Sequence, residues 1–344
     1  MAVMAVTGHA MAAPVAGVAP APIIFFGVPV DFILFGLTLL GVALFHHYVF
    51  QVALVGLAAI TLYKLAFTGF KFGTGLAGLA GHMAHEWVIV ANLFCLLMGF
   101  ALLARHFERS QVPDVMPRYL PDDWKGGFVL LALIWVLSSF LDNIAAALIG
   151  GTVALKVFRN KVHIGYLAAI VAASNAGGSF SVVGDTTTTM MWIDGISPLS
   201  VIEAIVAASV ALVVCGIPAA RQQQAYSPIA TDATPDVRVD WARILLVAFI
   251  LASAILANVI ANIFFPAILD SVPVIGVAVV LAILVTAPVR QPDWRLLVVN
   301  FKGTIFLLAL VTSASMMPVE RLPAASWETA LGLGFLSAVF DNIP

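Results

Sequence analysis

Long apolar runs separated by short polar stretches dominate the pattern along this chain. A helix that crosses the hydrocarbon core of a bilayer takes about 20 apolar residues, and shorter runs can enter it part of the way. The runs cover residues 23–45, 48–63, 87–103, 127–149, 164–193, 199–217, 244–265, 272–289, 304–317 and 330–340. This pattern predicts an all-α polytopic membrane protein, since helices satisfy their own backbone hydrogen bonds in lipid.

Composition and charge agree with this fold class and exclude others. Of the 344 residues 62% are apolar and 10% are charged, whereas about 25% are charged in an ordinary soluble domain. The net charge of -2 offers no basic excess that would neutralise nucleic-acid phosphates. Cys95 and Cys215 both lie inside apolar runs, which disfavours a disulfide or a metal site.

Three polar or irregular stretches interrupt the apolar pattern. Residues 1–22 contain no Lys or Arg and are expected to form a disordered leader. Residues 106–125 combine prolines, charges and aromatic side chains and are expected to lie at the membrane surface. Residues 218–242 are polar and are expected to be a cytoplasmic linker between two repeats, residues 23–217 and 243–344.

The positions of the basic residues predict the orientation of the spans. If residues 127–149 simply crossed the membrane, the bases of 105–125 and 156–161 would lie on opposite sides. If this segment turns near its middle and leaves by the same face, 13 of the 16 bases fall on one side, the cytoplasmic one. We therefore expect a re-entrant hairpin over about 127–157. An arm that ends near residue 138 would reach about 18 Å into a core of roughly 30 Å.

The sequence at the hairpin tip recurs near the end of the chain. The segment SFLDNI contains Asp142 and Asn143, and the segment SAVFDNI contains Asp341 and Asn342, 199 residues further on. On the predicted topology the second segment enters from the opposite face. Two facing hairpins are the inverted-repeat plan of secondary transporters, so we expect a transporter and not an enzyme. The sequence ends inside the second hairpin, so the second repeat is expected to be truncated.

A second polar feature interrupts the apolar run at 164–193. The stretch SNAGGSFSVVGDTTTT, residues 174–189, contains three glycines that permit an unwound backbone and hydroxyls that replace lost backbone partners. We expect a broken transmembrane helix in which Asp185 is an ion ligand or proton carrier. An extramembrane loop rich in Gly and Thr is the alternative.

The ionisable residues predicted at membrane depth, Asp142, Asp185 and Asp341, are all acidic. Free carbonyls at the end of the first hairpin arm, with Asp142 and the Asn143 oxygen, would form an oxygen cage for a small hard cation. Carboxylates that lie close together favour protonation of one of them when the cation leaves. The leading hypothesis is sodium (or lithium)/proton antiport across the inner membrane without a cofactor, with sodium at Asp142, Asn143 and Asp185. An N-cap role is the structural alternative for Asp142.

Other readings stay open. A permease for arsenite or an organic anion is the second functional hypothesis, and a nonfunctional or structural fragment is the third. His82, His85 and Glu86 have a metal-like spacing, but their predicted place at an outer boundary favours an interfacial cap or solvated loop. We expect Asn92 to make a helix–helix hydrogen bond and Asp31 to be a helix cap or a surface charge.

The paired Asp-Asn-Ile tips and the run SNAGGSFSVVGDTTTTMMW resemble the NhaD-type sodium/proton antiporters and the related ArsB arsenite permeases. The resemblance covers about residues 30–344 and implies a homodimer with a scaffold part and an elevator-like transport part. The dicarboxylate carriers of the same superfamily have Ser-Asn-Thr at their hairpin tips, which counts against a carboxylate substrate. By position, the resemblance implies that the ion or proton is bound by Asp142, Asn143, Ser174, Asn175, Asp185, Thr186, Thr187, Asp341 and Asn342.

Overall fold

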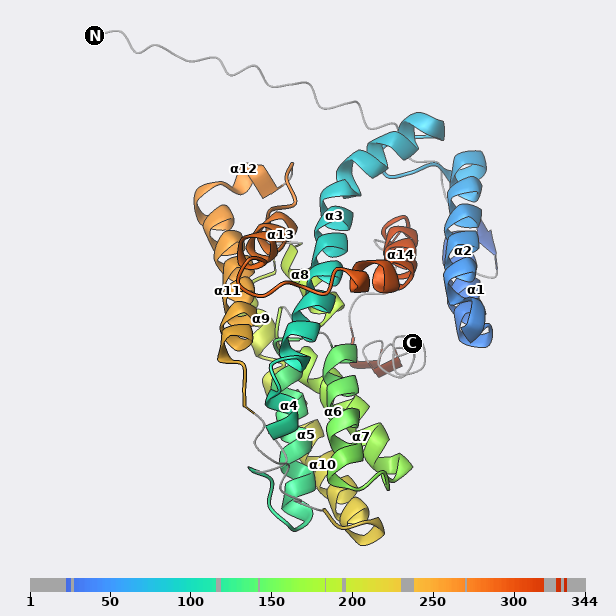
Figure 1. The fold of residues 1–344 in the computed structure, drawn as a ribbon. Helices are drawn as coiled ribbons and strands as arrows, with labels where there is room; N and C mark the ends of the chain where they lie inside the picture. The colour runs from blue at the N-terminus through green and yellow to red at the C-terminus, as the bar shows by residue number, and fades with distance from the viewer. Residues whose placement is uncertain are drawn as a thin grey trace, which may run out of the picture. The chain divides into compact units, whose positions relative to one another are not determined.

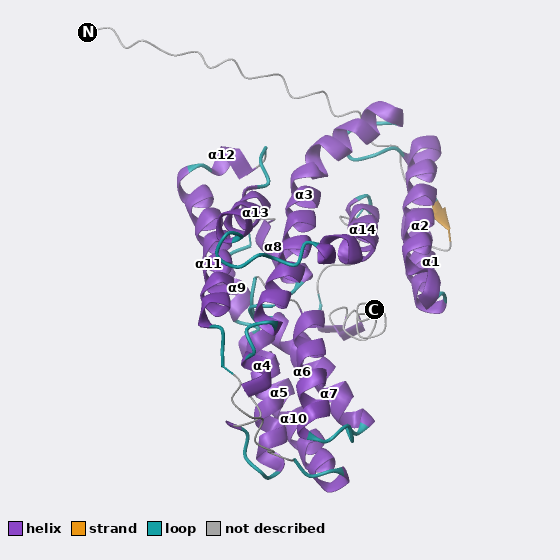
Figure 2. Cartoon of the chain, viewed as in Figure 1, coloured by secondary structure: helices purple, strands orange, loops and turns teal. Residues whose placement is uncertain are grey.

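The described part of the fold consists almost entirely of helices, with one short pair of strands (Figures 1 and 2). The structure, a computed structural model, describes residues 23–25, 28–115, 119–141, 143–182, 184–193, 196–229, 238–269, 271–318, 326–328 and 331–332. Within this part of the chain, five helical stretches are long and apolar enough to cross a membrane: His46–Thr68, Gly75–Glu108, Pro198–Tyr226, Trp241–Ala261 and Arg295–Ser315. The predicted all-α polytopic membrane fold is confirmed, and the inverted repeats stay a prediction.

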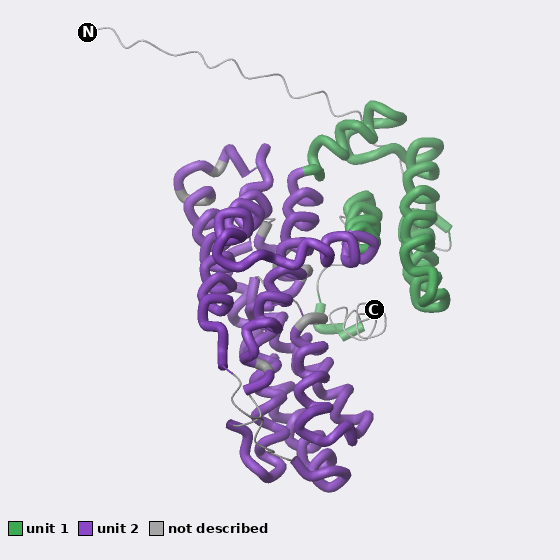
Figure 3. Tube along the Cα trace, viewed as in Figure 1, with its two compact units in different colours: residues 1–87, 305–344 green, residues 88–304 purple. Residues whose placement is uncertain are grey.

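The chain divides into two compact units, which Figure 3 distinguishes by colour. Unit 1 comprises Met1–Trp87 and Ile305–Pro344, and unit 2 comprises Val88–Thr304. The elements that lie wholly in unit 1 are β1 (Ile24–Phe25), β2 (Val28–Pro29), α1 (Val30–Leu44), the 3-10 helix η1 (His46–Tyr48), α2 (Val49–Tyr63) and the π-helix η2 (Lys64–Thr68). Helices α3 (Gly75–Glu108) and α14 (Arg295–Ser315) contribute to both units.

Unit 2 is built around two hydrophobic clusters. Its remaining elements are α4 (Val112–Val115), α5 (Trp124–Ser138), α6 (Asn143–Val157), α7 (Ile164–Gly178), α8 (Thr186–Ile193), α9 (Pro198–Ile202), α10 (Ile205–Tyr226), α11 (Trp241–Phe264), α12 (Pro266–Leu269) and α13 (Val274–Thr286). The first cluster joins α5, α6, α7 and α10, and the second joins α3, α8, α9, α11 and α13. Tyr166 and Ala173 of α7 pack in the first cluster, whereas Val182 and Trp192 pack in the second. The interruption between α7 and α8 therefore lies where the two clusters meet.

A buried ion pair ties the two ends of the α1–α2 hairpin in unit 1. The carboxylate oxygen Oδ1 of Asp31 lies 3.3 Å from the Nζ atom of Lys64, and the two side chains are 1% and 9% exposed. Asp31 stands in the first turn of α1, and Lys64 directly follows α2. The expectation that Asp31 is a cap or a surface charge was wrong, because the Lys64 ammonium compensates the carboxylate inside the fold.

Helix α3 begins well before the span predicted at 87–103. His82 and His85 are therefore helical residues, so the expectation of a cap or a solvated loop was wrong for them. His82 is buried, and its Nε2 atom lies 3.1 Å from the Ser315 hydroxyl, which supports the helix at this point. The expectation for Asn92 is confirmed, because its side-chain oxygen accepts a 2.9 Å hydrogen bond from the Gly276 N–H in the first turn of α13.

Helix α10 runs on into the polar stretch predicted as a linker and ends at Tyr226 rather than at residue 217. Gln223 explains this extension. Its side chain is fully buried, its amide nitrogen donates to the Lys161 carbonyl at 3.0 Å, and its amide oxygen accepts from the His163 N–H at 2.7 Å. Gln223 in the last turns of α10 thereby satisfies backbone groups of the connection between α6 and α7. The polarity of single residues along the sequence does not reveal this long-range contact.

Ion pairs connect several helix ends of unit 2. The basic residues in these pairs are among those predicted to lie on the cytoplasmic side of the membrane. Arg109 lies 2.5 Å from Asp293, which also lies 3.7 Å from Arg105. Arg290 donates to Asp240 at 3.0 Å, and this hydrogen bond holds the pKa of Asp240 below its usual range. These contacts join the C-terminal end of α3 to the start of α14, and the end of α13 to the start of α11.

Candidate ion-binding site

The first part of the site is a helical hairpin formed by α5 and α6. Tyr166 shows that the outer ends of both arms lie close together, because its hydroxyl donates to the Gly127 carbonyl at 2.6 Å and its ring packs against Phe158 at 5.2 Å. Nearer the tip, a Cβ atom on Gly150 would lie 2.3 Å from the Cδ1 atom of Ile134. The chain therefore doubles back between Ser138 and Asn143.

The arms of this hairpin are too short to cross a bilayer. Helices α5, α6 and α7 each have 15 residues, which corresponds to about 22 Å. The hydrocarbon core is roughly 30 Å thick. Helices of this length fit a hairpin and a broken helix that end inside the hydrocarbon core. The re-entrant placement of the hairpin stays a prediction.

The second part of the site is the interruption between α7 and α8. Side-chain hydroxyls bind the backbone carbonyls on both sides of it. The Ser179 hydroxyl donates to the Ala176 carbonyl at 2.8 Å, and the Thr188 hydroxyl donates to the carbonyls of Ser181 and Asp185 at 2.6 and 3.0 Å. The run of Ser and Thr thus supplies donors that the interrupted helix lacks, as helix ends require.

Glycines let the interrupted helix lie directly against the hairpin. A Cβ atom on Gly177 would be 2.1 Å from the Trp135 carbonyl oxygen of α5, and one on Gly184 would be 2.5 Å from the Ser138 carbonyl oxygen. The Ser138 hydroxyl also donates to the Ser174 carbonyl at 2.5 Å. The hairpin and the interrupted helix therefore touch backbone to backbone near the hairpin tip.

Three of the predicted site residues meet at this contact. The side-chain nitrogen of Asn143, the first residue of α6, donates to Oδ1 of Asn175 at 2.9 Å. The same nitrogen lies 3.4 Å from Oδ1 of Asp185. All three side chains are partly buried. The Asn175 amide oxygen and the Asp185 carboxylate oxygen are thereby gathered around the Asn143 side-chain nitrogen. Such hard oxygen donors suit small hard cations.

The other predicted site residues differ in their positions. Ser174 is buried, and its hydroxyl donates to the Val171 carbonyl of its own helix at 2.9 Å. Thr187 is exposed. Thr186 begins α8, but its side chain lies outside the description. Asp142, Asp341 and Asn342 lie outside the described residues.

Two residues at the site were not predicted from the sequence. Thr188 caps the interrupted backbone, and Ser138 joins the hairpin to α7. Thr188 is one of four consecutive threonines in the motif at residues 174–189. The motif therefore predicted a threonine at this place but did not show which of the four it is. Ser138 lies at the predicted tip and could have been chosen because a hydroxyl can satisfy a carbonyl at a helix end.

Replacing Gly177 with alanine tests the close packing of this site. The added methyl would meet backbone atoms of α5, which cannot rotate away as a side chain could. We expect the purified protein to lose about 1–3 kcal/mol of unfolding free energy, the usual cost of overpacking. Thermal unfolding in detergent measures the change.

Gly151→Ala in α6 is the matched control, because nothing lies within 4 Å of the Cβ position at Gly151. We expect this variant to be at least as stable as the wild type, since alanine favours a helix over glycine by about 0.5–1 kcal/mol. Equal stability of the two variants would contradict the packing described for α5 and α7.

Comparison with known proteins links this chain to antiporters. No protein-family profile matches it. It is 28% identical to sodium/proton antiporter 1 of Arabidopsis thaliana over 171 residues. This match covers 47% of this chain and 28% of the length of that protein. It is 32% identical over 119 residues to the Na(+)/H(+) antiporter NhaD of Vibrio parahaemolyticus, which is 32% of this chain and 28% of that protein.

A further match is to sodium/proton antiporter 2 of Arabidopsis thaliana, at 38% identity over 80 residues, or 21% of this chain and 19% of that protein. The matched segments span less than a third of each relative. The resemblance to sodium/proton antiporters, NhaD among them, is confirmed at this modest identity. The link to the arsenite permeases stays a prediction.

Proposed function

We propose that this chain takes part in the exchange of sodium or lithium for protons across a membrane, through a site at the contact of the α5–α6 hairpin with the interrupted helix. The observation that carries the proposal is the meeting of Asn143, Asn175 and Asp185 within hydrogen-bond distance. The names of the relatives as sodium/proton antiporters support it at the level of cation/proton antiport.

In this proposal Asp185 alternates between a cation-bound and a protonated state. When a cation lies against the carboxylate, its charge compensates the negative charge away from bulk water. When the cation leaves, a proton restores neutrality, so one site serves both ions by competition. Asp142 directly precedes Asn143 in the sequence and is included as a second carboxylate.

The remaining predicted properties belong to the same proposal. Ser174, Thr186 and Thr187 would add hydroxyl oxygens to the ion site. Asp341 and Asn342 would bind the ion from the opposite hairpin. A homodimer in the cell inner membrane is the proposed setting. Arsenite or an organic anion would be the substrate if the site instead bound an oxyacid.

Proteoliposomes that contain the 344-residue chain and an entrapped pH dye test the proposal. We expect sodium or lithium added outside to enter in exchange for luminal protons and so to alkalinise the lumen, and potassium at the same ionic strength to have no effect. A response to citrate or arsenite without one to sodium would support the permease instead. No response to any of these solutes would contradict transport by this chain.

A further inference from the structure

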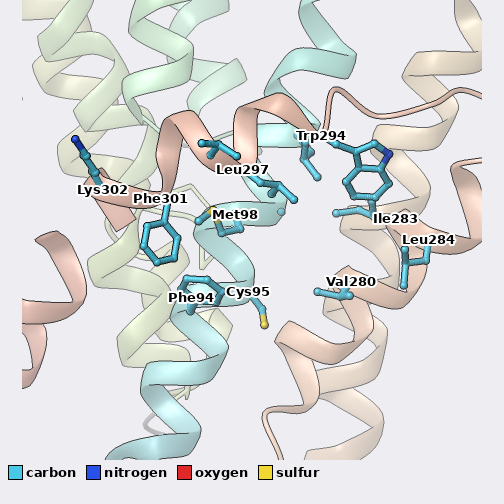
Figure 4. Close-up of a pocket in the computed structure, with 13 residues that line it drawn as sticks. Phe94, Cys95, Met98, Val280, Ile283, Leu284, Trp294, Leu297, Phe301 and Lys302 are labelled. Atoms are coloured by element: carbon cyan, nitrogen blue, oxygen red, sulfur yellow. The ribbon is translucent and has the colours of Figure 1, made fainter. Parts of the chain in front are cut away.

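An apolar pocket of about 550 Å³ lies within unit 2, and its lining includes none of the residues of the proposed ion site. Three helices line it, α3 with Phe94 and Met98, α13 with Val280 and α14 with Phe301, and Trp294 adds its side chain from directly before α14. Figure 4 shows these side chains turned toward a common space between the helices. A space of this size and lining is within the usual range for pockets that hold small apolar ligands.

The pocket has one charged residue in its lining, Lys302. Figure 4 shows the Lys302 chain extending outward at one end of the pocket, with Trp294 at the other end. Lys302 is exposed and forms no ion pair with any residue of the described part of the chain. The nearby acid Asp293 is already paired with Arg105 and Arg109. The pocket therefore combines an apolar interior with a positive charge at its rim that no residue of the described ranges compensates.

We propose that this pocket binds one acyl chain of an anionic phospholipid, whose phosphate lies against Lys302. Helices α3 and α14 have the length and composition of membrane spans, so hydrocarbon is the medium that meets an open apolar wall between them. Lysine near such a surface reaches toward the headgroup layer. Basic side chains between membrane helices are a known basis for recognition of anionic headgroups.

Trp294 provides a local probe for this lipid, because its indole lines the pocket. The chain has seven tryptophans, so the Trp294 signal is the difference in fluorescence between the wild type and Trp294→Phe. We would reconstitute both proteins in phosphatidylcholine with a brominated quencher, either brominated phosphatidylglycerol or brominated phosphatidylcholine. We expect the anionic quencher to act on Trp294 about fivefold more effectively, the ratio that roughly 1 kcal/mol for one basic residue gives.

Lys302→Gln is expected to bring this ratio close to one. Lys125→Gln is the matched control, because Lys125 is an exposed lysine at the start of α5, outside the pocket lining, and the ratio should persist in that variant. If Lys302→Gln does not fold, raising the salt concentration on the wild type tests the same contact, since screening should lower the ratio. Equal quenching by the two lipids in the wild type would overturn the proposal. Quenching of Trp294 by neither lipid would also overturn it and would indicate that protein fills the pocket.

Discussion

Replacement of Asp185 with asparagine is expected to abolish sodium-driven proton movement in proteoliposomes. The asparagine side-chain oxygen can still accept the hydrogen bond from Asn143, so the contact between the hairpin and the interrupted helix should persist. The amide, however, carries no charge to balance a cation and binds no proton. We expect exchange to fall by at least about 100-fold, the lower range of what a positioned proton-transferring side chain supplies.

Glu203→Gln gives the control for this experiment, because it makes the same change from carboxylate to amide at an exposed position between α9 and α10. Exchange in this variant should match the wild type. Thermal unfolding of both variants should also match, which separates a lost ion ligand from a lost fold. Exchange by Asp185→Asn within twofold of the wild type would contradict the assignment of Asp185 to the ion site.

Breaking the buried pair of Asp31 and Lys64 is expected to have the largest effect on stability. Lys64→Met leaves a buried carboxylate without its counter-charge, and Asp31→Leu leaves a buried ammonium. Removal of one partner of a buried ion pair costs about 3–5 kcal/mol, whereas replacement of both partners by apolar residues is often nearly neutral. We therefore expect each single variant to unfold well below the wild type in detergent and the double variant to recover most of the loss.

Lys71→Met is the control for the charge change, since Lys71 is exposed in a turn. Its unfolding free energy should stay within about 0.5 kcal/mol of the wild type, as for surface substitutions generally. Additive losses in the Asp31→Leu/Lys64→Met double variant would contradict a direct pairing of the two side chains.

Several features could be predicted because they depend on neighbours in the sequence. The apolar runs fixed the all-α membrane class, and a polar residue inside such a run, Asn92, predicted a helix–helix hydrogen bond that is present. Glycines and hydroxyl residues around Gly177 and Thr188 predicted an interruption between two helices. These signals are local, because helix formation and burial in lipid are decided over windows of a few turns.

Other features could not be predicted because the partner is far away in the sequence. Asp31 looked like a helix cap, and only the packing of α1 against α2 brings Lys64 to it. The extra turns of α10 depend on Gln223 reaching the connection after α6. A polar residue at the end of an apolar run has the same local pattern whether water or a buried partner satisfies it.

By itself, the sequence determined that this protein is a bundle of membrane helices with a hairpin tip at residues 138–143 and an interruption before Asp185. The tertiary structure decided which polar atoms meet, placing Asn143 against Asn175 and Asp185. It also decided where apolar walls enclose the pocket beside Lys302. This division has a physical cause. Hydropathy and backbone freedom are properties of short segments, so the sequence reveals them. The pairing of charges and amides depends on how closely distant helices pack, which only the tertiary structure determines.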